Sequence, residues 1–314
     1  PSVPGLGIPL NFCLLARDIP RSEKASIVRG IPKPGTDGPL RSTAILRPIS
    51  VSPIVGRLLH KILASRLSHT LSSHHILDPA QFSFLPGLGI GHALDQLLAC
   101  LRQSASSVDF TPPRELYTIF YDISKAYDNL TWSSIFRALR RLGFPPEFID
   151  FVRNALQGTT LSMYTNRPGH ITASVAIQKA IKQGCPLAPL LFILVLDEMH
   201  VRYRAVGGYT LHAPPSSPSS HLIPSPTSPS VIISSVGYCD DTTILASSLE
   251  TLAALHQVTY EFFSYHGLTL NISKSLMTGR SLSGAPLEDT FTWPPSAPHS
   301  ISPLDSSAVK PLSL

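Results

Sequence analysis

Residues 231–246 read VIISSVGYCDDTTILA and place the pair Asp240–Asp241 between two runs of β-prone residues. β-Branched and aromatic side chains favour strands, and aspartate is common in turns. The stretch therefore predicts a β-hairpin with two adjacent carboxylates at its tip. An ordinary turn without any further role is an alternative that the pair by itself leaves open.

A third carboxylate, Asp122, directly follows LYTIFY at 116–121, whose aromatic and β-branched content predicts a buried strand. Only 20 residues of the chain are acidic, so acids at the ends of two apolar strands require an explanation. Carboxylates held rigidly by neighbouring strands can bind a hard divalent cation. Two such ions can activate an attacking hydroxyl and stabilise the leaving oxygen of a phosphoryl transfer.

Around these strands, the spacing of apolar residues predicts helices. Thr131 is the expected N-cap of one helix and Gly143 its stop, and a proline lies in the first turn of the next. The predicted helices cover 54–71, 131–142, 145–156, 187–204 and 248–266, and a further strand covers 159–166.

The composition is that of a globular protein, with 43% hydrophobic and 14% charged residues. The net charge is +5, and the basic excess lies in residues 1–70. Such a region suits a phosphate-rich partner, although a solvated basic surface has the same composition. Residues 213–230 consist mostly of Pro and Ser without any charge, which predicts a flexible insertion. The same bias after Arg280 predicts a disordered tail at 281–314.

Several classes of protein are disfavoured by what the sequence lacks. The four cysteines have neither the spacing of a zinc site nor that of a disulfide framework. The longest apolar run, 187–196, is about half of the roughly 20 residues that a membrane-spanning helix needs. Because no secretory signal opens the chain, we expect an intracellular protein without membrane contact. The first residue is Pro1 rather than Met, which suggests a piece of a longer chain.

Three motifs contain or lie between the carboxylates: YDISKAYD at 121–128, KQGCPLAPLLF at 182–192 and YCDD at 238–241. Four more flank them: IPKPG at 31–35, RPISV at 47–51, QFSFLPG at 81–87 and GLTLNISKS at 267–275. In this order the motifs resemble the reverse transcriptase family, in which the first three match palm motifs and the other four match fingers and late-palm motifs. These motifs are most similar to those of non-LTR retrotransposons and group II intron polymerases. The resemblance covers roughly residues 25–280.

The resemblance implies an α+β fold, that of a right-hand polymerase of fingers and palm with an antiparallel palm sheet and packed helices. The fingers-like region would be 31–115 and the palm 116–280, after an N-terminal extension at 1–30. The thumb would be absent or incomplete, since nothing after Arg280 matches one.

Carried over to matching positions, the family pattern makes Asp122, Asp240 and Asp241 the catalytic carboxylates and metal ligands. The expected cofactor is a pair of Mg²⁺ ions, with Mn²⁺ as a substitute. Asp128 lies outside this set and is expected to be structural.

Nucleotide-binding residues also follow from the resemblance: Lys33, Arg47, Tyr127, Gln183, Gly184 and Lys274. The two finger cations would grip the triphosphate, and the Gln-Gly pair would contact the nascent base pair. The Tyr127 ring would clash with a ribonucleotide 2′-hydroxyl, and Lys274 would protonate the departing pyrophosphate. A surface cation and a core aromatic remain the alternatives for the finger cations and for Tyr127.

The implied function is RNA-directed DNA synthesis in retrotransposition. RNA template, DNA primer and deoxynucleoside triphosphates would be the partners, without a stable protein partner. The protein would act in the nucleus when chromosomal DNA is the target and otherwise in the cytoplasm.

Departures from the family pattern keep other hypotheses open. Cys239 occupies the small position of the catalytic tetrad, and Leu85 and Leu88 stand where arginines are usual. One alternative is therefore a catalytically inactive retrotransposon relic that at most binds nucleic acid. An RNA-dependent RNA polymerase is another, against which the tyrosine-led YCDD and Tyr127 argue.

Overall fold

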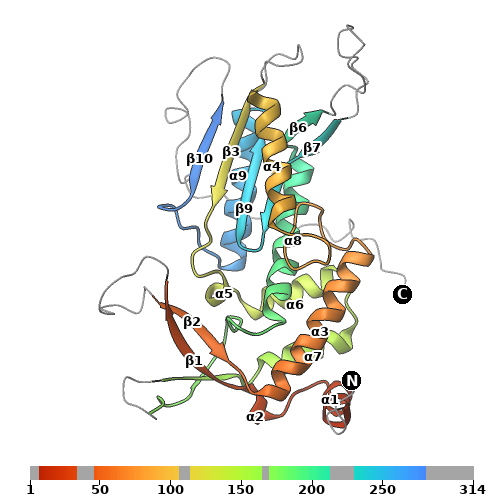
Figure 1. The fold of residues 1–314 in the computed structure, drawn as a ribbon, viewed down its shortest axis with the longest axis vertical. Coiled ribbons are helices and arrows are strands. Elements are labelled where there is room, and N and C mark those ends of the chain that lie inside the picture. The colour runs from red at the N-terminus through yellow and green to blue at the C-terminus, as the bar shows by residue number, and fades with distance from the viewer. Residues whose placement is uncertain (1–6, 34–45, 106–113, 165–169, 213–229, 281–314) are drawn as a thin grey trace. The chain divides into compact units, whose positions relative to one another are not determined.

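The computed structural model describes residues 7–33, 46–105, 114–164, 170–212 and 230–280 (Figure 1). These residues form two compact units. The first contains the described residues up to Thr70 together with Lys125–Val195, and the second contains Leu71–Ser124 and the described residues from Leu196 onward. The predicted insertion, apart from Ser230, and the predicted tail lie outside the described residues. Within the described part of the chain, no helix has the length and apolarity to cross a membrane.

The first unit contains a mixed sheet in the order β2-β1-β4-β5. Its strands are β1 (Ala25–Pro32), β2 (Leu46–Val51), β4 (Thr160–Met163) and β5 (Val175–Ala176). β1 pairs antiparallel with β2 and parallel with β4. Because side chains alternate along a strand, Ser26 and Val28 are buried on one face whereas Arg29 and Ile31 are exposed on the other.

The helices predicted from apolar spacing in the first unit are present, and the described residues form three shorter ones that were not predicted. Together these helices are α1 (Gly7–Leu15), α2 (Arg21–Lys24), most of α3 (Ile54–Ser73), α5 (Ala126–Asn129), α6 (Trp132–Arg141), α7 (Pro146–Leu156) and the first residues of α8 (Ala188–Val206). The Thr131 side chain accepts the Ser134 N–H at 3.3 Å and caps α6 as predicted. Gly143, with φ 74°, follows the end of α6, and Pro146 opens α7.

The second unit is built on an antiparallel sheet in the order β10-β3-β9-β8. Its strands are β3 (Leu116–Tyr121), β8 (Ser235–Tyr238), β9 (Asp241–Ala246) and β10 (Leu276–Arg280). Helices α4 (Ile90–Ala105) and α9 (Leu249–His266) cover opposite faces of this sheet (Figure 1). Alternate residues of β3 therefore face different helices, with Leu116 in a cluster with Cys100 of α4 and Tyr121 against His256 of α9.

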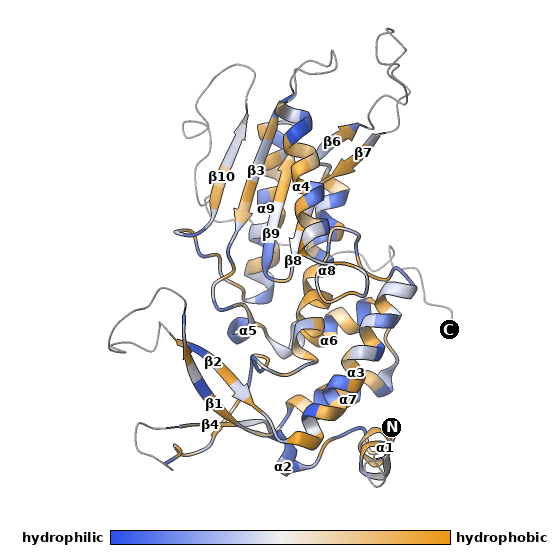
Figure 2. Ribbon diagram, in the orientation of Figure 1, coloured by the Kyte–Doolittle hydropathy of each residue, from blue (hydrophilic) through white to orange (hydrophobic). Residues whose placement is uncertain are grey.

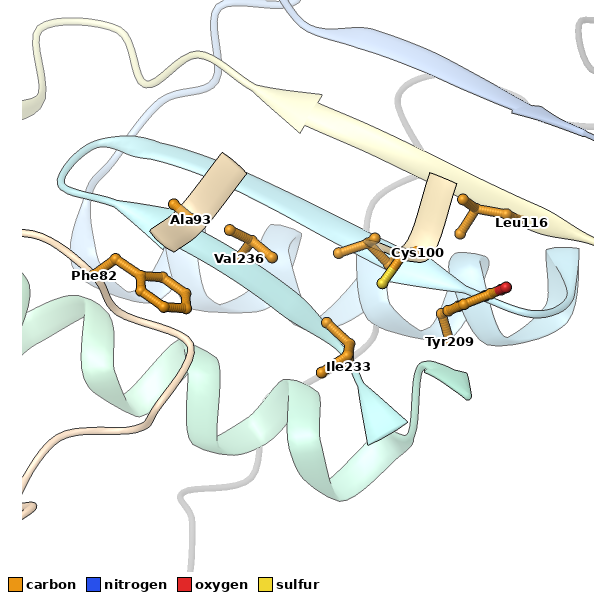
Figure 3. Close-up of a cluster of buried hydrophobic side chains, with 8 residues drawn as sticks. Phe82, Ala93, Cys100, Leu116, Tyr209, Ile233 and Val236 are labelled. Atoms are coloured by element: carbon orange, nitrogen blue, oxygen red, sulfur yellow. The ribbon is translucent and has the colours of Figure 1, made fainter. Parts of the chain in front are cut away.

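A hydrophobic cluster fixes the α4 side of this sheet (Figure 3). Its buried members are Phe82, Ala93, Cys100, Leu116, Tyr209, Ile233, Val236 and Leu245. Much of β3 and β9 has the colour of hydrophobic residues, whereas β8 is pale (Figure 2). Full burial of a large apolar side chain contributes about 1.5–3 kcal/mol, so this cluster holds β8 and β9 in place.

Two features differ from the sequence-based prediction. β8 and β9 form the expected hairpin, but β7 (Ser230–Ile233) pairs with β6 (Tyr209–His212) in a separate two-stranded sheet. Gly208 permits this pairing, because a Cβ there would lie 2.4 Å from the Ile233 carbonyl oxygen. In addition, no helix was predicted for α1, α2, α4 or α5, and β1 begins inside the predicted N-terminal extension. The predicted subdivision into fingers and palm follows motif order rather than contacts and stays a prediction.

Candidate active site

Asp122 and Asp241 lie at the same end of two neighbouring strands of the second unit. In the antiparallel pairing of β3 with β9, Tyr121 is opposite Thr242, so the next residue in register places Asp122 opposite Asp241. The Asp122 side chain is half-buried and that of Asp241 is exposed. The expectation that the strand end and the hairpin lie side by side is therefore met.

Asp240 belongs to the tight turn that joins β8 to β9. Tyr238 pairs with Asp241, which leaves Cys239 and Asp240 as a two-residue turn. Cys239 has φ 60°, whereas Asp240 is not among the residues with positive φ. A positive φ at the first turn residue is the pattern of a type II′ turn, a position that favours glycine. Cys239 is 7% exposed, so a buried, strained residue precedes the two acids.

The three carboxylates influence one another electrostatically. Partial burial raises the pKa of Asp241, and the negative charges of Asp240 and Asp122 raise it further. Carboxylate oxygens are the ligands of hard divalent cations, and a cation here would offset this repulsion. Among the described residues, however, no three acidic, histidine or cysteine side chains converge as a preassembled metal site. The donor set thus fits a divalent ion, although its members do not close on one point.

A buried polar network holds the end of β3 that precedes Asp122. The Tyr121 hydroxyl lies 2.8 Å from Nδ1 of His256. The same Tyr121 hydroxyl accepts a hydrogen bond from the Thr259 hydroxyl at 3.2 Å. Tyr203 of α8 lies 2.6 Å from the same threonine hydroxyl. Burial lowers the pKa of His256 to about 4, so its ring is neutral at physiological pH. The network therefore positions the strand without placing a charge behind the carboxylates.

The segment that contains Lys274 is joined to the backbone of Asp122. The Asp122 N–H donates to the Ser275 hydroxyl at 3.2 Å, and the Asn271 N–H donates to the Asp122 carbonyl at 2.8 Å. Lys274 lies within this turn and its side chain is exposed. The predicted proton donor is thus carried by a segment that contacts the candidate site.

In the first unit, the loop before α8 is held against β1 and β2. The Ser50 N–H donates to the Gln183 carbonyl at 2.7 Å. Gly184 has φ 108°, and a Cβ there would lie 2.7 Å from the Ser50 carbonyl oxygen. The glycine is therefore required by the contact with β2, which is a structural reason separate from the predicted approach to a base pair.

Lys182 anchors the same loop, and the sequence analysis assigned it no role. Its Nζ donates to the Lys24 carbonyl and to the Ser26 hydroxyl, both at 2.8 Å. Burial lowers the pKa of Lys182 to about 8. A lysine directly before the Gln-Gly pair was the available signal, but its partners, at the end of α2 and in β1, lie more than 150 positions away.

Lys33 and Arg47 are both exposed on the β1–β2 hairpin of the first unit. Arg47 pairs with Ile31 in the register of these strands, and Lys33 directly follows β1. On the same face, the Arg29 guanidinium lies 5.0 Å from the ring centroid of Tyr164. The predicted finger cations thus belong to an exposed basic face.

Tyr127 and Asp128 lie in the short helix α5. The Tyr127 ring is half-buried and stacks on Phe192, with 5.3 Å between ring centroids and 15° between planes. Burial raises the pKa of Asp128, and Lys125 and Lys179 lower it. The Tyr127 ring thus has a packing contact on Phe192, and part of the ring stays exposed.

The predicted residues are divided between the units. The catalytic carboxylates and Lys274 lie in the second unit, and the other predicted nucleotide-binding residues lie in the first. Gln81 and Ser83, quoted in a motif but given no role, also lie in the second unit and hydrogen bond to the turn at Cys239. A buried amide within an otherwise apolar segment was the signal that could have identified them.

Comparisons with known proteins agree with the motif order. The family described as reverse transcriptase (RNA-dependent DNA polymerase) matches residues 31–290. The chain is 30% identical over 270 residues to the retrovirus-related Pol polyprotein from type-2 retrotransposable element R2DM of Drosophila melanogaster, covering 86% of this chain and 23% of the relative. It is 29% identical over 284 residues to the retrovirus-related Pol polyprotein from type-1 retrotransposable element R2 of Popillia japonica, and the match covers 88% of this chain and 35% of that relative. The chain thus spans about a quarter to a third of the length of these curated relatives.

The fold has counterparts among solved structures. Apo telomerase from Candida tropicalis, truncated from its C-terminal domain, matches with a TM-score of 0.54 at 12% identity, covering 84% of this chain and 51% of that one. The α+β fold expected of polymerase fingers and palm is therefore confirmed. By its motifs, its carboxylates and its relatives, the chain belongs to the reverse transcriptase family and is similar to the Pol polyproteins of non-LTR retrotransposable elements.

Proposed function

We propose that the chain catalyses RNA-directed DNA synthesis, in which a DNA primer is extended with deoxynucleotides on an RNA template during retrotransposition. The observation that carries this proposal is the meeting of Asp122, Asp240 and Asp241 at one end of an antiparallel sheet. Membership of the reverse transcriptase family supports the same reaction. We also propose that the protein acts inside the cell, in the nucleus when chromosomal DNA is the target.

Reverse transcriptases generally use divalent metal ions, and we infer two Mg²⁺ ions here, replaceable by Mn²⁺. Asp122 and Asp241 would hold them from opposite strands, and Asp240 would add a carboxylate from the turn. When bound, such ions supply charge neutralisation for the attacking and leaving oxygens of the phosphoryl transfer. Lys33 and Arg47 would bind the triphosphate, and the exposed Lys274 would hold a proton for the departing pyrophosphate.

Primer extension by the purified protein tests this function. We expect incorporation of deoxynucleotides on a primed RNA template with Mg²⁺, and we expect Asp122→Asn and Asp240→Asn to reduce it to background. Asp128→Asn is a matched control, because it neutralises a second carboxylate of the 121–128 motif, one that lies in α5 and is not an expected metal ligand. Unchanged incorporation by Asp240→Asn would reduce the hairpin to an ordinary turn. Retained RNA binding without incorporation by the unaltered protein would support the inactive relic.

Sugar discrimination tests the role of Tyr127. Its ring is braced by Phe192, so we expect Tyr127→Ala to admit ribonucleotides while Tyr127→Phe retains discrimination. The measurement is the ratio of kcat/KM for deoxynucleotides to that for ribonucleotides. An unchanged ratio for Tyr127→Ala would assign the ring to packing, and a preference for ribonucleotides in the unaltered protein would support an RNA polymerase.

A further inference from the structure

We propose that Gln81, together with Ser83, is a positioning residue that fixes the turn carrying the catalytic carboxylates. The proposal rests on the proposed polymerase function, because it concerns the geometry of Asp240 and Asp241. Gln81 and Ser83 are 1% and 0% exposed, so neither is placed to contact a substrate.

The contact that carries the proposal is made to the backbone of the strained turn residue. The Cys239 N–H donates to Oε1 of Gln81 at 3.2 Å and to the Ser83 hydroxyl at 3.0 Å. The Ser83 hydroxyl in turn donates to the same Oε1 at 2.8 Å, and the Ser83 N–H donates to it at 3.1 Å. Three donors therefore surround one amide oxygen, which fixes the orientation of the Gln81 side chain.

The segment that bears these side chains runs beside β8 and forms an isolated β-bridge with it. Gln81 forms a parallel bridge with Gly237. The Gly237 N–H donates to the Ala80 carbonyl at 2.8 Å, and the Phe82 N–H donates to the Gly237 carbonyl at 2.9 Å. Phe82 lies in the hydrophobic cluster beside Val236 (Figure 3). Phe82 thus anchors the segment in the core while its two neighbours reach the turn.

The segment is also tied to helix α8 within the same unit. The Asp78 N–H donates to the Asp197 carboxylate at 2.6 Å, and the Asp78 carboxylate forms an ion pair with Arg204. The Ala80 N–H donates to the other oxygen of Asp78 at 2.9 Å. A continuous path of contacts therefore leads from a long helix to the amide of Cys239.

The turn needs such support because of its backbone conformation. A non-glycine residue with positive φ is strained and persists only where its surroundings determine it. Cys239 is such a residue, and it directly precedes Asp240 and Asp241. Groups that orient metal ligands from outside the ligand set typically change metal affinity or activity by about 10–100-fold when removed.

The test compares Gln81→Met with Phe82→Leu. The first removes the acceptor from a side chain of similar length, and the second weakens the same segment in the core without altering the bonds to Cys239. For Gln81→Met we expect kcat to fall by roughly 10–100-fold and the half-saturating Mg²⁺ concentration to rise about tenfold, with KM for the primer-template unchanged. We also expect faster amide exchange and faster thiol labelling at Cys239, followed by mass spectrometry. Phe82→Leu is expected to lower thermal stability while Mg²⁺ dependence and Cys239 protection stay as in the unaltered protein.

Equal effects of the two substitutions on Mg²⁺ dependence and Cys239 protection would overturn the proposal, as would unaltered protection in Gln81→Met. Should Gln81→Met not fold, Ser83→Ala removes one acceptor with little loss of volume and is judged by the same measurements. If the unaltered protein incorporates no nucleotide, the proposed function fails, yet exchange and labelling at Cys239 still decide whether Gln81 holds the turn.

Discussion

The repulsion between the carboxylates of the candidate site lowers the stability of the fold, as the pKa of Asp241 indicates. Its pKa is raised by partial burial and by the charges of Asp240 and Asp122. An acid with a raised pKa binds its proton more tightly in the folded state than in the unfolded state. The free energy of unfolding of the metal-free protein therefore falls as pH rises from the unfolded pKa through the folded pKa of Asp241. At neutral pH the ionised carboxylates destabilise the fold unless a cation offsets their repulsion.

Neutralising one carboxylate should accordingly stabilise the metal-free protein. We expect Asp122→Asn to raise Tm in EDTA by roughly 1–3 °C, because one source of repulsion on Asp241 is removed. The same change should abolish the rise in Tm that Mg²⁺ produces in the unaltered protein, since stabilisation by a ligand depends on its affinity for the folded state. Thermal unfolding with EDTA and with Mg²⁺ measures both effects.

Asp128→Asn serves as the control for this prediction. Burial raises the pKa of Asp128, and Lys125 and Lys179 act in the opposite direction, but Asp128 is not among the charges that raise the pKa of Asp241. We therefore expect Asp128→Asn to leave the repulsion on Asp241 in place and the response of Tm to Mg²⁺ unchanged. A fall in Tm in EDTA for Asp122→Asn, or an equal loss of the Mg²⁺ response in both variants, would contradict this prediction.

At the scale of elements, the local sequence correctly predicted the features that depend on neighbouring residues, such as strands and helix caps. The aromatic and β-branched run at 116–121 is β3, and the caps at Thr131 and Gly143 act where the sequence placed them. The two acids of the hairpin and the acid after β3 were assigned to one site from motif order, and strand register brings Asp122 opposite Asp241.

Pairings between distant segments were not predictable in the same way. Nothing within VIISSVGY distinguishes the half that joins β6 from the half that joins β9. The role of Gln81 depends on a β-bridge to Gly237, which lies 156 positions later in the chain. The spacing of apolar residues in the 80–83 segment does not predict this bridge. The close contact of Gly184 with Ser50 likewise depends on a distant segment, and the approach to a base pair that the resemblance implies stays a prediction.

Gly237 offers a test of how tightly the catalytic hairpin is packed. A Cβ at this position would lie 2.7 Å from Cε1 and Nε2 of His200 and 3.3 Å from Nε2 of Gln81. His200 is 1% exposed and its Nδ1 lies 2.9 Å from the Ser235 hydroxyl, so the ring cannot easily move away. We expect Gly237→Ala to lower the free energy of unfolding by about 1–3 kcal/mol, as overpacking of a filled core does.

Chemical denaturation measures this change, and Gly87→Ala is the comparison. Gly87 has positive φ but no atom within 4 Å of the added Cβ, so its cost would come from the backbone alone. In Gly237→Ala, activity should fall together with stability, because β8 leads directly into the turn before Asp240. A stability loss in Gly237→Ala smaller than that in Gly87→Ala would show that His200 and Gln81 move aside.

At the scale of the whole molecule, the excess of basic over acidic residues lies in residues 1–70. The strands β1, β2, β4 and β5 carry no Asp or Glu, while Arg29, Lys33 and Arg47 are exposed on or beside β1 and β2. Tyr164, 43% exposed, stacks under Arg29. Cations beside an aromatic ring suit a single-stranded nucleic acid, whose phosphates and bases they can contact together.

The salt dependence of RNA binding tests whether this face contacts phosphates. Each phosphate neutralised on a single strand contributes about 0.7 to the slope of log K against log salt concentration. We expect a triple variant, Arg29→Gln with Lys33→Gln and Arg47→Gln, to weaken binding and to reduce the slope by about 2, as measured by fluorescence anisotropy over a range of salt concentrations. The charge-matched control replaces Arg57, Lys61 and Arg66 of α3 with glutamine, and its slope should change by less. Equal changes in the two variants would mean that total charge, rather than the sheet face, governs binding.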